Sequence, residues 1–237
     1  YGYLGGGIFK STDNGATFNR IAATAPTPND TVSDFAYINA IACHPSKANK
    51  IYVATNKGLK ISKDGGATWL DVFGAQKFPA TDIKIGNDGT FYLAQDAFRP
   101  WQSNKFKGTT NLYTSTSGDT GYANWTCRSS WLKLNEFDTT GIKLPTSFPR
   151  STTGTTRDST YGIKLAVSPQ DPNYVYALAV RLGKLGGVFK SVNKGSSWEM
   201  IGPGNSTLFN PFNNATASSA YAITVSPSNK EEILVGG

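Results

Sequence analysis

Short segments that are apolar throughout, or that alternate between apolar and polar residues, recur along the chain and are separated by polar turns. Residues 59–62 alternate, as a strand with one buried face does, while residues 51–54 and 174–177 are apolar runs bounded by turn residues. No segment approaches the roughly 20 consecutive apolar residues of a membrane-spanning helix. The pattern predicts many short strands in an all-β fold, with no insertion into a membrane.

A turn of the form S-x-[DN]-x-G-x-[ST]-[WF], which we call the box turn, occurs three times, each time after a short predicted strand. Its Asp or Asn can accept hydrogen bonds from backbone N–H groups, and its Gly can adopt the left-handed conformation. Its aromatic residue begins the next strand and is expected to pack into the core. The three copies contain Ser11, Asp13, Gly15 and Phe18; Ser62, Asp64, Gly66 and Trp69; and Ser191, Asn193, Gly195 and Trp198.

A fourth, distorted copy of the box turn is formed by Ser115, Asp119, Gly121 and Trp125. A second repeated element, made of a strand, a polar turn with Pro or Gly and another strand, precedes the box turns. One unit is therefore strand, turn, strand, short link, strand, box turn and strand. Four antiparallel strands per unit form the blade of a β-propeller.

The spacing of these units predicts a single propeller segment over residues 1–237 with about four blades. The predicted parts are a partial blade at 1–20, blades at 35–72, 81–135 and 161–201, and a partial blade at 219–237. Two insertions, 97–111 and 128–160, interrupt the repeat. Joining the end of the chain to its start would complete one more unit, so a closed four-bladed ring is the alternative to a segment of a larger propeller.

The box turns, together with the motifs x-x-[SH]-P and [IV]-Y-[VA]-A, resemble the Asp-box (BNR) repeat propellers. Within that group the chain is most similar to the xyloglucanase-type glycoside hydrolases and to the sortilin (VPS10-like) receptor domains. The resemblance implies a secreted or cell-surface protein in which the box turn is structural and distant from the ligand face. Because propellers of this group usually have six or more blades, it also favours a segment of a longer chain over a closed ring.

The distribution of charge and the two cysteines argue against some classes of function. The 23 basic residues outnumber the 16 acidic ones but are scattered, which argues against a nucleic-acid groove. The densest group, Lys57, Lys60 and Lys63, is interpreted as a solvated strand edge. Cys43 and Cys127 could form one disulfide or remain free, and neither belongs to a CxxC pair.

Catalytic and metal chemistry finds little support in the sequence. With one histidine, His44, a Ser-His-Asp triad or a histidine zinc cluster is excluded, and no cofactor or metal site is predicted. Asp34, Asp96 and Asp119, which lie outside the regular box turns, are the weak candidates for catalytic carboxylates. No catalytic residue is assigned, because 16 acidic residues always offer some pair.

The two insertions are the places where a rigid scaffold would present binding residues. Arg99, Trp101 and Trp131 could form an aromatic platform with a cationic partner, or they could pin the loops onto the blades. The sequence favours a non-catalytic scaffold that binds a protein or glycan partner, including other parts of the same longer chain. The alternatives are a fragment of a xyloglucanase-like glycoside hydrolase and a sortilin-like peptide-binding domain.

Overall fold

The computed structural model describes residues 4–27, 29, 32–74, 78–96, 110–128, 160–181, 184–203, 211–212 and 221–237. Within this part of the chain the regular structure is β-sheet, apart from two short 3₁₀ helices at Ala22–Thr24 and Tyr122–Asn124. No helix among these residues is long and apolar enough to span a membrane. The all-β prediction is confirmed.

Three four-stranded antiparallel sheets and two two-stranded sheets make up the structure. The first complete sheet contains β3 (Ile38–Cys43), β4 (Ile51–Thr55), β5 (Gly58–Ser62) and β6 (Leu70–Asp71). The second contains β7 (Ala80–Ile85), β8 (Phe91–Asp96), β9 (Thr110–Ser115) and β10 (Thr126–Cys127). The third contains β11 (Thr160–Val167), β12 (Val175–Arg181), β13 (Lys184–Ser191) and β14 (Glu199–Pro203).

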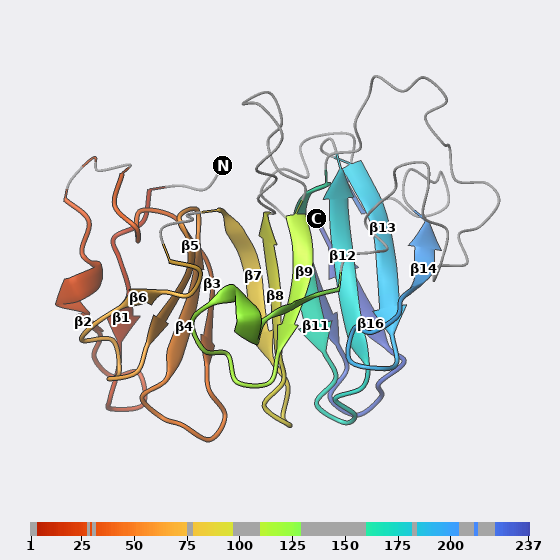
Figure 1. Ribbon diagram of the computed structural model, residues 1–237, viewed down its shortest axis with the longest axis horizontal. Helices are drawn as coiled ribbons and strands as arrows, with labels where there is room; N and C mark the ends of the chain where they lie inside the picture. The colour runs from red at the N-terminus through yellow and green to blue at the C-terminus, as the bar shows by residue number, and fades with distance from the viewer. Residues whose placement is uncertain are drawn as a thin grey trace.

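The two-stranded sheets are β1 (Phe9–Lys10) with β2 (Asn19–Arg20) and β15 (Ala222–Val225) with β16 (Ile233–Gly236). In Figure 1 the three complete sheets stand side by side, with β1 and β2 at the left edge of the view. The β1–β2 sheet packs on the β3–β6 sheet, whereas the β15–β16 sheet packs on the β11–β14 sheet. The two partial blades therefore belong to opposite ends of the row and do not combine into one blade, as a closed four-bladed ring would require.

Each sheet follows the chain order of its strands, and the first strands of neighbouring sheets lie next to one another: β3 beside β7, β7 beside β11 and β11 beside β15. This arrangement of four-stranded antiparallel blades, joined along their first strands, is that of a β-propeller. We call the sheet end that carries the box turns the box end. The other end, where β3, β7 and β11 begin, we call the loop end.

Burial on both faces explains why β4 and β12 are apolar at nearly every position. In β4, Tyr52 and Ala54 pack toward the β7–β10 sheet while Val53 packs toward the β1–β2 sheet. In β12, Ala177 and Tyr176 likewise face two different neighbouring sheets. A central strand between two packed neighbours has no solvent-facing side, so the alternation typical of a half-buried strand disappears.

Lys60 corrects one interpretation of the sequence. Instead of lying on a solvated edge, it is 2% exposed and its ammonium group donates hydrogen bonds to the carboxylates of Asp34 and Asp71. The alternating pattern of β5 places Lys60 on the face that packs toward the β1–β2 sheet, where burial requires a partner for its charge. Two carboxylates supply that partner.

Candidate functional site

The three box turns are closed by their own side chains. In the first copy the Asp13 carboxylate accepts hydrogen bonds from the Thr17 N–H at 2.9 Å and the Thr17 hydroxyl at 2.5 Å. The Ser11 hydroxyl oxygen accepts from the Gly15 N–H at 2.8 Å, with Gly15 at a φ of 89°. These bonds lower the pKa of Asp13 to about 2, chiefly through the hydroxyl and N–H of Thr17.

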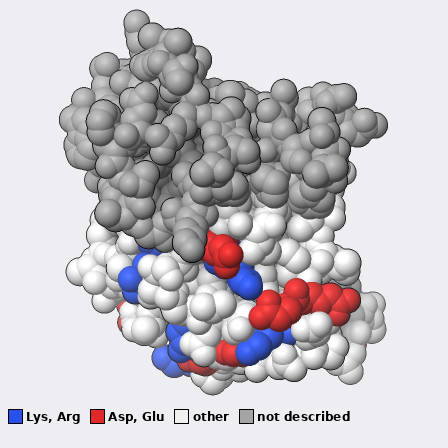
Figure 2. All heavy atoms as spheres, turned by 90° about the vertical axis from the view of Figure 1, so that its right-hand side faces the viewer, with Lys and Arg blue, Asp and Glu red and all other residues white. Residues whose placement is uncertain are grey.

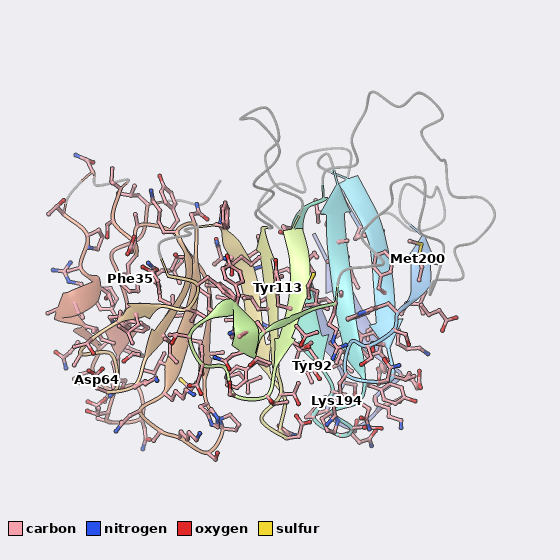
Figure 3. The ribbon with its side chains drawn as sticks, in the orientation of Figure 1. Phe35, Asp64, Tyr92, Tyr113, Lys194 and Met200 are labelled. Atoms are coloured by element: carbon pink, nitrogen blue, oxygen red, sulfur yellow. The ribbon has the colours of Figure 1, made fainter. Side chains whose placement is uncertain are left out.

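The same set of bonds recurs in the other two copies. The residues concerned are Ser62, Asp64, Gly66 and Thr68 in one copy and Ser191, Asn193, Gly195 and Ser197 in the other. In the last copy an amide replaces the carboxylate, and its nitrogen donates to the Ser197 hydroxyl at 2.7 Å. Figure 3 labels Asp64 and Lys194 at the same lower edge of the sheets, away from the loop end. The box turns therefore lie at the opposite end of the sheets from the strand ends that flank residues 97–109 and 129–159.

The aromatic residues of the box turns are not all buried. Trp198 is 5% exposed and packs on Leu112 of the preceding sheet, and its indole N–H donates to the Gly195 carbonyl at 3.0 Å. Trp125 packs in the same way on the β3–β6 sheet. Phe18, which we expected in the core, is 63% exposed. Each box aromatic packs on the sheet that precedes its own, and no sheet precedes the β1–β2 sheet among the described residues.

In the distorted fourth copy of the box turn, the Ser and Trp side chains make the same kinds of hydrogen bond as in the regular copies, and the Asp side chain does not. The Ser115 hydroxyl oxygen accepts a hydrogen bond from the Gly118 N–H at 2.9 Å, and the indole N–H of Trp125 donates to the Asp119 carbonyl at 2.9 Å. The Asp119 carboxylate instead accepts a hydrogen bond from the Lys50 ammonium at 3.1 Å. Asp119, one of the candidate catalytic carboxylates, thus joins its own sheet to the neighbouring β3–β6 sheet.

The polar groups nearest the loop end form a belt across the first strands. The side-chain amide of Asn39 on β3 donates to the Asn56 side-chain oxygen at 2.9 Å and to the Ala80 carbonyl on β7 at 2.8 Å. The ammonium of Lys164 on β11 donates to the carbonyls of Asn39, at 3.3 Å, and Thr81, at 2.9 Å. We call Asn39, Asn56, Thr81 and Lys164 the inner polar belt.

Close packing extends this belt to the next strand. A Cβ atom on Gly162 of β11 would lie 1.8 Å from the hydroxyl oxygen of Tyr221, so this position needs glycine for the Tyr221 ring to pack there. The Lys164 ammonium lies 5.9 Å from the centre of the same ring. Burial lowers the pKa of Lys164. The belt therefore holds one half-buried cation among amides, carbonyls and an aromatic ring.

Gln95 adds an unsatisfied acceptor beside the belt. It is 2% exposed, it pairs with Ala80 across β7 and β8, and its side-chain oxygen accepts no hydrogen bond from the residues that the structure describes. Ala80 also receives the Asn39 amide, so the Gln95 backbone lies next to the belt. A buried acceptor without a donor is uncommon in folded proteins and is satisfied when a donor enters. Nothing in the sequence distinguishes Gln95 from an ordinary strand residue.

The structure places the predicted ligand residues as follows. Arg99, Trp101 and Trp131 lie outside the described residues, as does the side chain of Asp96. Asp34 is bonded to Lys60 and Asp119 to Lys50. Within the described part, no three His, Cys, Asp or Glu side chains gather in a way that could hold a metal ion.

The remaining reactive side chains lie apart from the belt. Cys43 and Cys127 are both exposed, and they do not form a disulfide with each other. His44 is a turn residue, and its Nδ1 atom lies 3.2 Å from the Ser46 backbone N–H. Among the described residues, the inner polar belt beside Gln95 is thus the arrangement best suited to contact a polar ligand near the loop end.

Comparison with known proteins identifies similar folds. No protein-family model matches the sequence, and no curated protein matches it. A GH74 enzyme from Niastella koreensis matches 83% of the chain with a TM-score of 0.52 and 17% identity. The GH74 xyloglucanase from Xanthomonas campestris matches 83% with a TM-score of 0.53 and 21% identity. An ancestral GH74 enzyme matches 94% with a TM-score of 0.51 and 22% identity.

The chain spans about a quarter of the length of these enzymes, covering 26%, 27% and 23% of them. The sequence identities are low, so the likeness concerns the fold. It agrees with the sheet order and with the contacts between first strands described above. The chain therefore has the β-propeller fold that is also found in GH74 enzymes.

Proposed function

We propose that this chain is a non-catalytic, glycan-binding β-propeller segment of an extracellular protein of the Asp-box group. The observation that carries the proposal is the buried Gln95 oxygen, which has no hydrogen-bond donor among the described residues, on the strand position paired with Ala80, whose carbonyl accepts the Asn39 amide. Amide groups both donate and accept hydrogen bonds, as the hydroxyl groups of a neutral sugar require. A few such groups on a rigid scaffold are typical of a small-ligand site.

The acidic residues support a non-catalytic role in the described part of the chain. A glycosidase needs two carboxyl groups that face the sugar. In the described part of this chain many carboxylates have structural partners. Asp13 and Asp64 close box turns, and Asp82 accepts hydrogen bonds from backbone N–H groups. The other paired acids, each bonded to a lysine, are Asp34, Asp71, Asp88, Asp119, Asp171 and Glu231.

Affinity electrophoresis in gels that contain xyloglucan tests the proposal, since the similar enzymes include a xyloglucanase. Retardation of the native chain that is lost with Gln95→Leu and reduced with Asn56→Ala is the expected result. Asn19→Ala, in the exposed β2 strand, is the matched control and should behave as the native chain. Equal mobility of all four proteins with and without the polysaccharide would overturn the assignment of a glycan site.

Glycoside hydrolysis is the second candidate, because Asp34 and Asp71 meet at one ammonium group. The two carboxylates thus lie close together, as the acids of a retaining glycosidase do. The release of reducing ends from xyloglucan, abolished by Asp71→Asn, would establish this activity in place of the binding function. The sortilin-like alternative stays a prediction.

We also propose that another blade of the same repeat covers the exposed face of the β1–β2 sheet. Phe9 in β1 is 54% exposed and Phe18, which directly precedes β2, is 63% exposed, while Phe189, the counterpart of Phe9, is buried against the preceding sheet. The test is the stability of Phe18→Ala in the full-length natural protein. A loss there comparable to that of Trp198→Ala supports coverage, and no loss contradicts it.

A further inference from the structure

A shallow hollow of about 420 Å³ lies at the box end, between the β3–β6 and β7–β10 sheets. It is lined by Lys47, Ala48, Asn49, Lys50, Lys63 and Asp119. The turn between β3 and β4 supplies four of these residues, the second box turn supplies Lys63, and the distorted box turn supplies Asp119. The hollow is therefore separated by the length of the strands from the inner polar belt.

Positive charge exceeds negative charge in this hollow. The Asp119 carboxylate lies 3.1 Å from the Lys50 ammonium and 3.8 Å from that of Lys63. The hydrogen bond from Lys50, together with the charges of Lys50, Lys63 and Lys47, lowers the pKa of Asp119. The lining therefore holds three lysines and one carboxylate, which leaves two positive charges without a counter-charge there.

The charges of the same lysines also affect the pKa of the neighbouring His44. Burial lowers its pKa, and the charges of Lys47 and Lys50 lower it further. His44 therefore stays neutral at pH 7 and supplies no additional cation. The excess charge resides in the lysines.

Other contacts between sheets at the box end are balanced. Lys194 of the third box turn bonds Asp88 of the preceding sheet at 2.5 Å. Lys230 bonds Asp171 at 3.0 Å. Figure 2 shows acidic and basic side chains lying side by side on the lower part of the end that carries β14 and β16. One lysine for one carboxylate is thus sufficient to join two sheets here, so Lys47 and Lys63 are surplus to that structural role.

The three lysines are also differently placed for binding. Lys50 is fixed, because its ammonium donates to the Ser117 carbonyl at 3.0 Å as well as to Asp119. The Lys63 ammonium lies beyond hydrogen-bond distance from Asp119, and its side chain is 56% exposed. Lys47 lines the same hollow and is exposed. One anchored cation and two solvent-accessible ones can enclose a small anion from several sides.

We propose that this hollow binds a phosphate group, with Lys47 and Lys63 as its principal donors and Lys50 as a fixed positive charge. A phosphomonoester carries a charge of about −1.5 to −2 at pH 7 and three acceptor oxygens, which matches the surplus charge and the donors of the lysines. The proposal is independent of glycan binding at the loop end, because the two places share no residue.

The test is an NMR titration of the chain at low ionic strength, where screening is weakest. The probes are inorganic phosphate, glucose 6-phosphate and, as the uncharged control, glucose. Saturable shifts are expected at the backbone amides of 47–50 and 63–65 with both phosphates and not with glucose. Tighter binding of one phosphate identifies the free ion or the sugar ester as the better ligand.

Some variants should weaken phosphate binding and one should strengthen it, which makes the test specific. Lys47→Ala and Lys63→Ala should each weaken phosphate binding about tenfold, as loss of a charge-assisted hydrogen bond does. Asp119→Asn should strengthen it, because a competing negative charge is removed. Lys57→Ala, a lysine variant at the loop end, should leave the affinity unchanged.

Three results would overturn the proposal. The first is the absence of saturable shifts at these amides with either phosphate. The second is an equal loss of affinity in Lys57→Ala and Lys63→Ala, which would indicate non-specific attraction to a basic chain. The third is weaker binding by a folded Asp119→Asn variant, with folding checked by the dispersion of the same spectra.

Discussion

The ammonium nitrogen of Lys164 lies 3.3 Å from the backbone carbonyl oxygen of Asn39, 125 positions earlier in the chain. The same nitrogen reaches the Thr81 carbonyl at 2.9 Å. One side chain on β11 therefore satisfies backbone groups on β3 and β7. It joins three sheets at a place where their first strands meet.

Replacing this side chain should reduce stability. Lys164→Met keeps most of the apolar part of the side chain but leaves two carbonyl groups without their donor. We expect the free energy of unfolding to fall by about 1–3 kcal/mol, the usual cost of an unsatisfied buried polar group. Urea denaturation measures the change, with the exposed Lys47→Met as control. A loss no greater than that of the control would show that the carbonyls find water instead.

The pH dependence of the same pair of proteins gives a second prediction. Burial lowers the pKa of Lys164, so between its folded pKa and its unfolded pKa the unfolded chain binds more protons than the folded one. The free energy of unfolding contributed by this group therefore rises with pH across that interval. The native chain should gain stability relative to Lys164→Met as the pH increases through it. A difference that stays constant with pH would contradict the lowered pKa.

Trp198 and Phe18 occupy the same position of the repeat, so truncation of each isolates the effect of burial. Trp198→Ala should cost about 3–5 kcal/mol, because the ring is buried against Leu112. In the 237-residue chain Phe18→Ala should change stability by less than about 0.5 kcal/mol, as surface substitutions do. Chemical denaturation compares the two. A large cost for Phe18→Ala in this chain would mean that a partner, such as a second copy, covers the ring in solution.

Gly162 should not tolerate a side chain. A Cβ there would overlap the Tyr221 hydroxyl, so Gly162→Ala must displace the ring and should lower stability by about 1–3 kcal/mol. Gly236→Ala is the matched control, since no heavy atom lies within 4 Å of its added Cβ. Adding Tyr221→Phe should recover part of the loss by removing the hydroxyl. Thermal denaturation of these variants decides the point, and equal melting temperatures for both alanine variants would refute it.

The first box turn should titrate at unusually low pH. Hydrogen bonds from Thr17 lower the pKa of Asp13 to about 2, so the stability they provide is present above the unfolded pKa and is lost as the pH falls through about 2. Carbon-13 NMR of the carboxyl group measures the midpoint directly. Thr17→Val should raise the pKa of Asp13 and leave that of Asp64 unchanged. A midpoint near 4 in the native chain would show that the turn is open in solution.

The repeat made the fold predictable, because each box turn depends on residues within seven positions of one another. Local hydrogen bonds of this kind leave a fixed spacing of Ser, Asp and Gly in the sequence. The burial of Trp198 followed from the same logic. The exposure of Phe18 did not, since it depends on which sheet lies beside it and not on its own repeat.

The charged residues could not be placed from the sequence for the same reason. Lys60 lies in an alternating strand and was expected at a solvated edge, yet it bonds Asp34 from a separate loop, 26 positions away. The Gln95 acceptor has no sequence signal at all, because whether a buried acceptor meets a donor depends on every surrounding group. Contacts between sheets determine these roles, and the repeat describes only the sheets themselves.

Asp119 also bears on the order in which the sheets assemble. A regular box carboxylate closes a contact four residues away, which costs little chain entropy and can form within an isolated hairpin. The Asp119 carboxylate instead bonds Lys50, 69 positions earlier. Its contact closes a loop of 69 residues, so we expect it to form later in folding than the contacts of the regular box turns and to tie the second blade to the first.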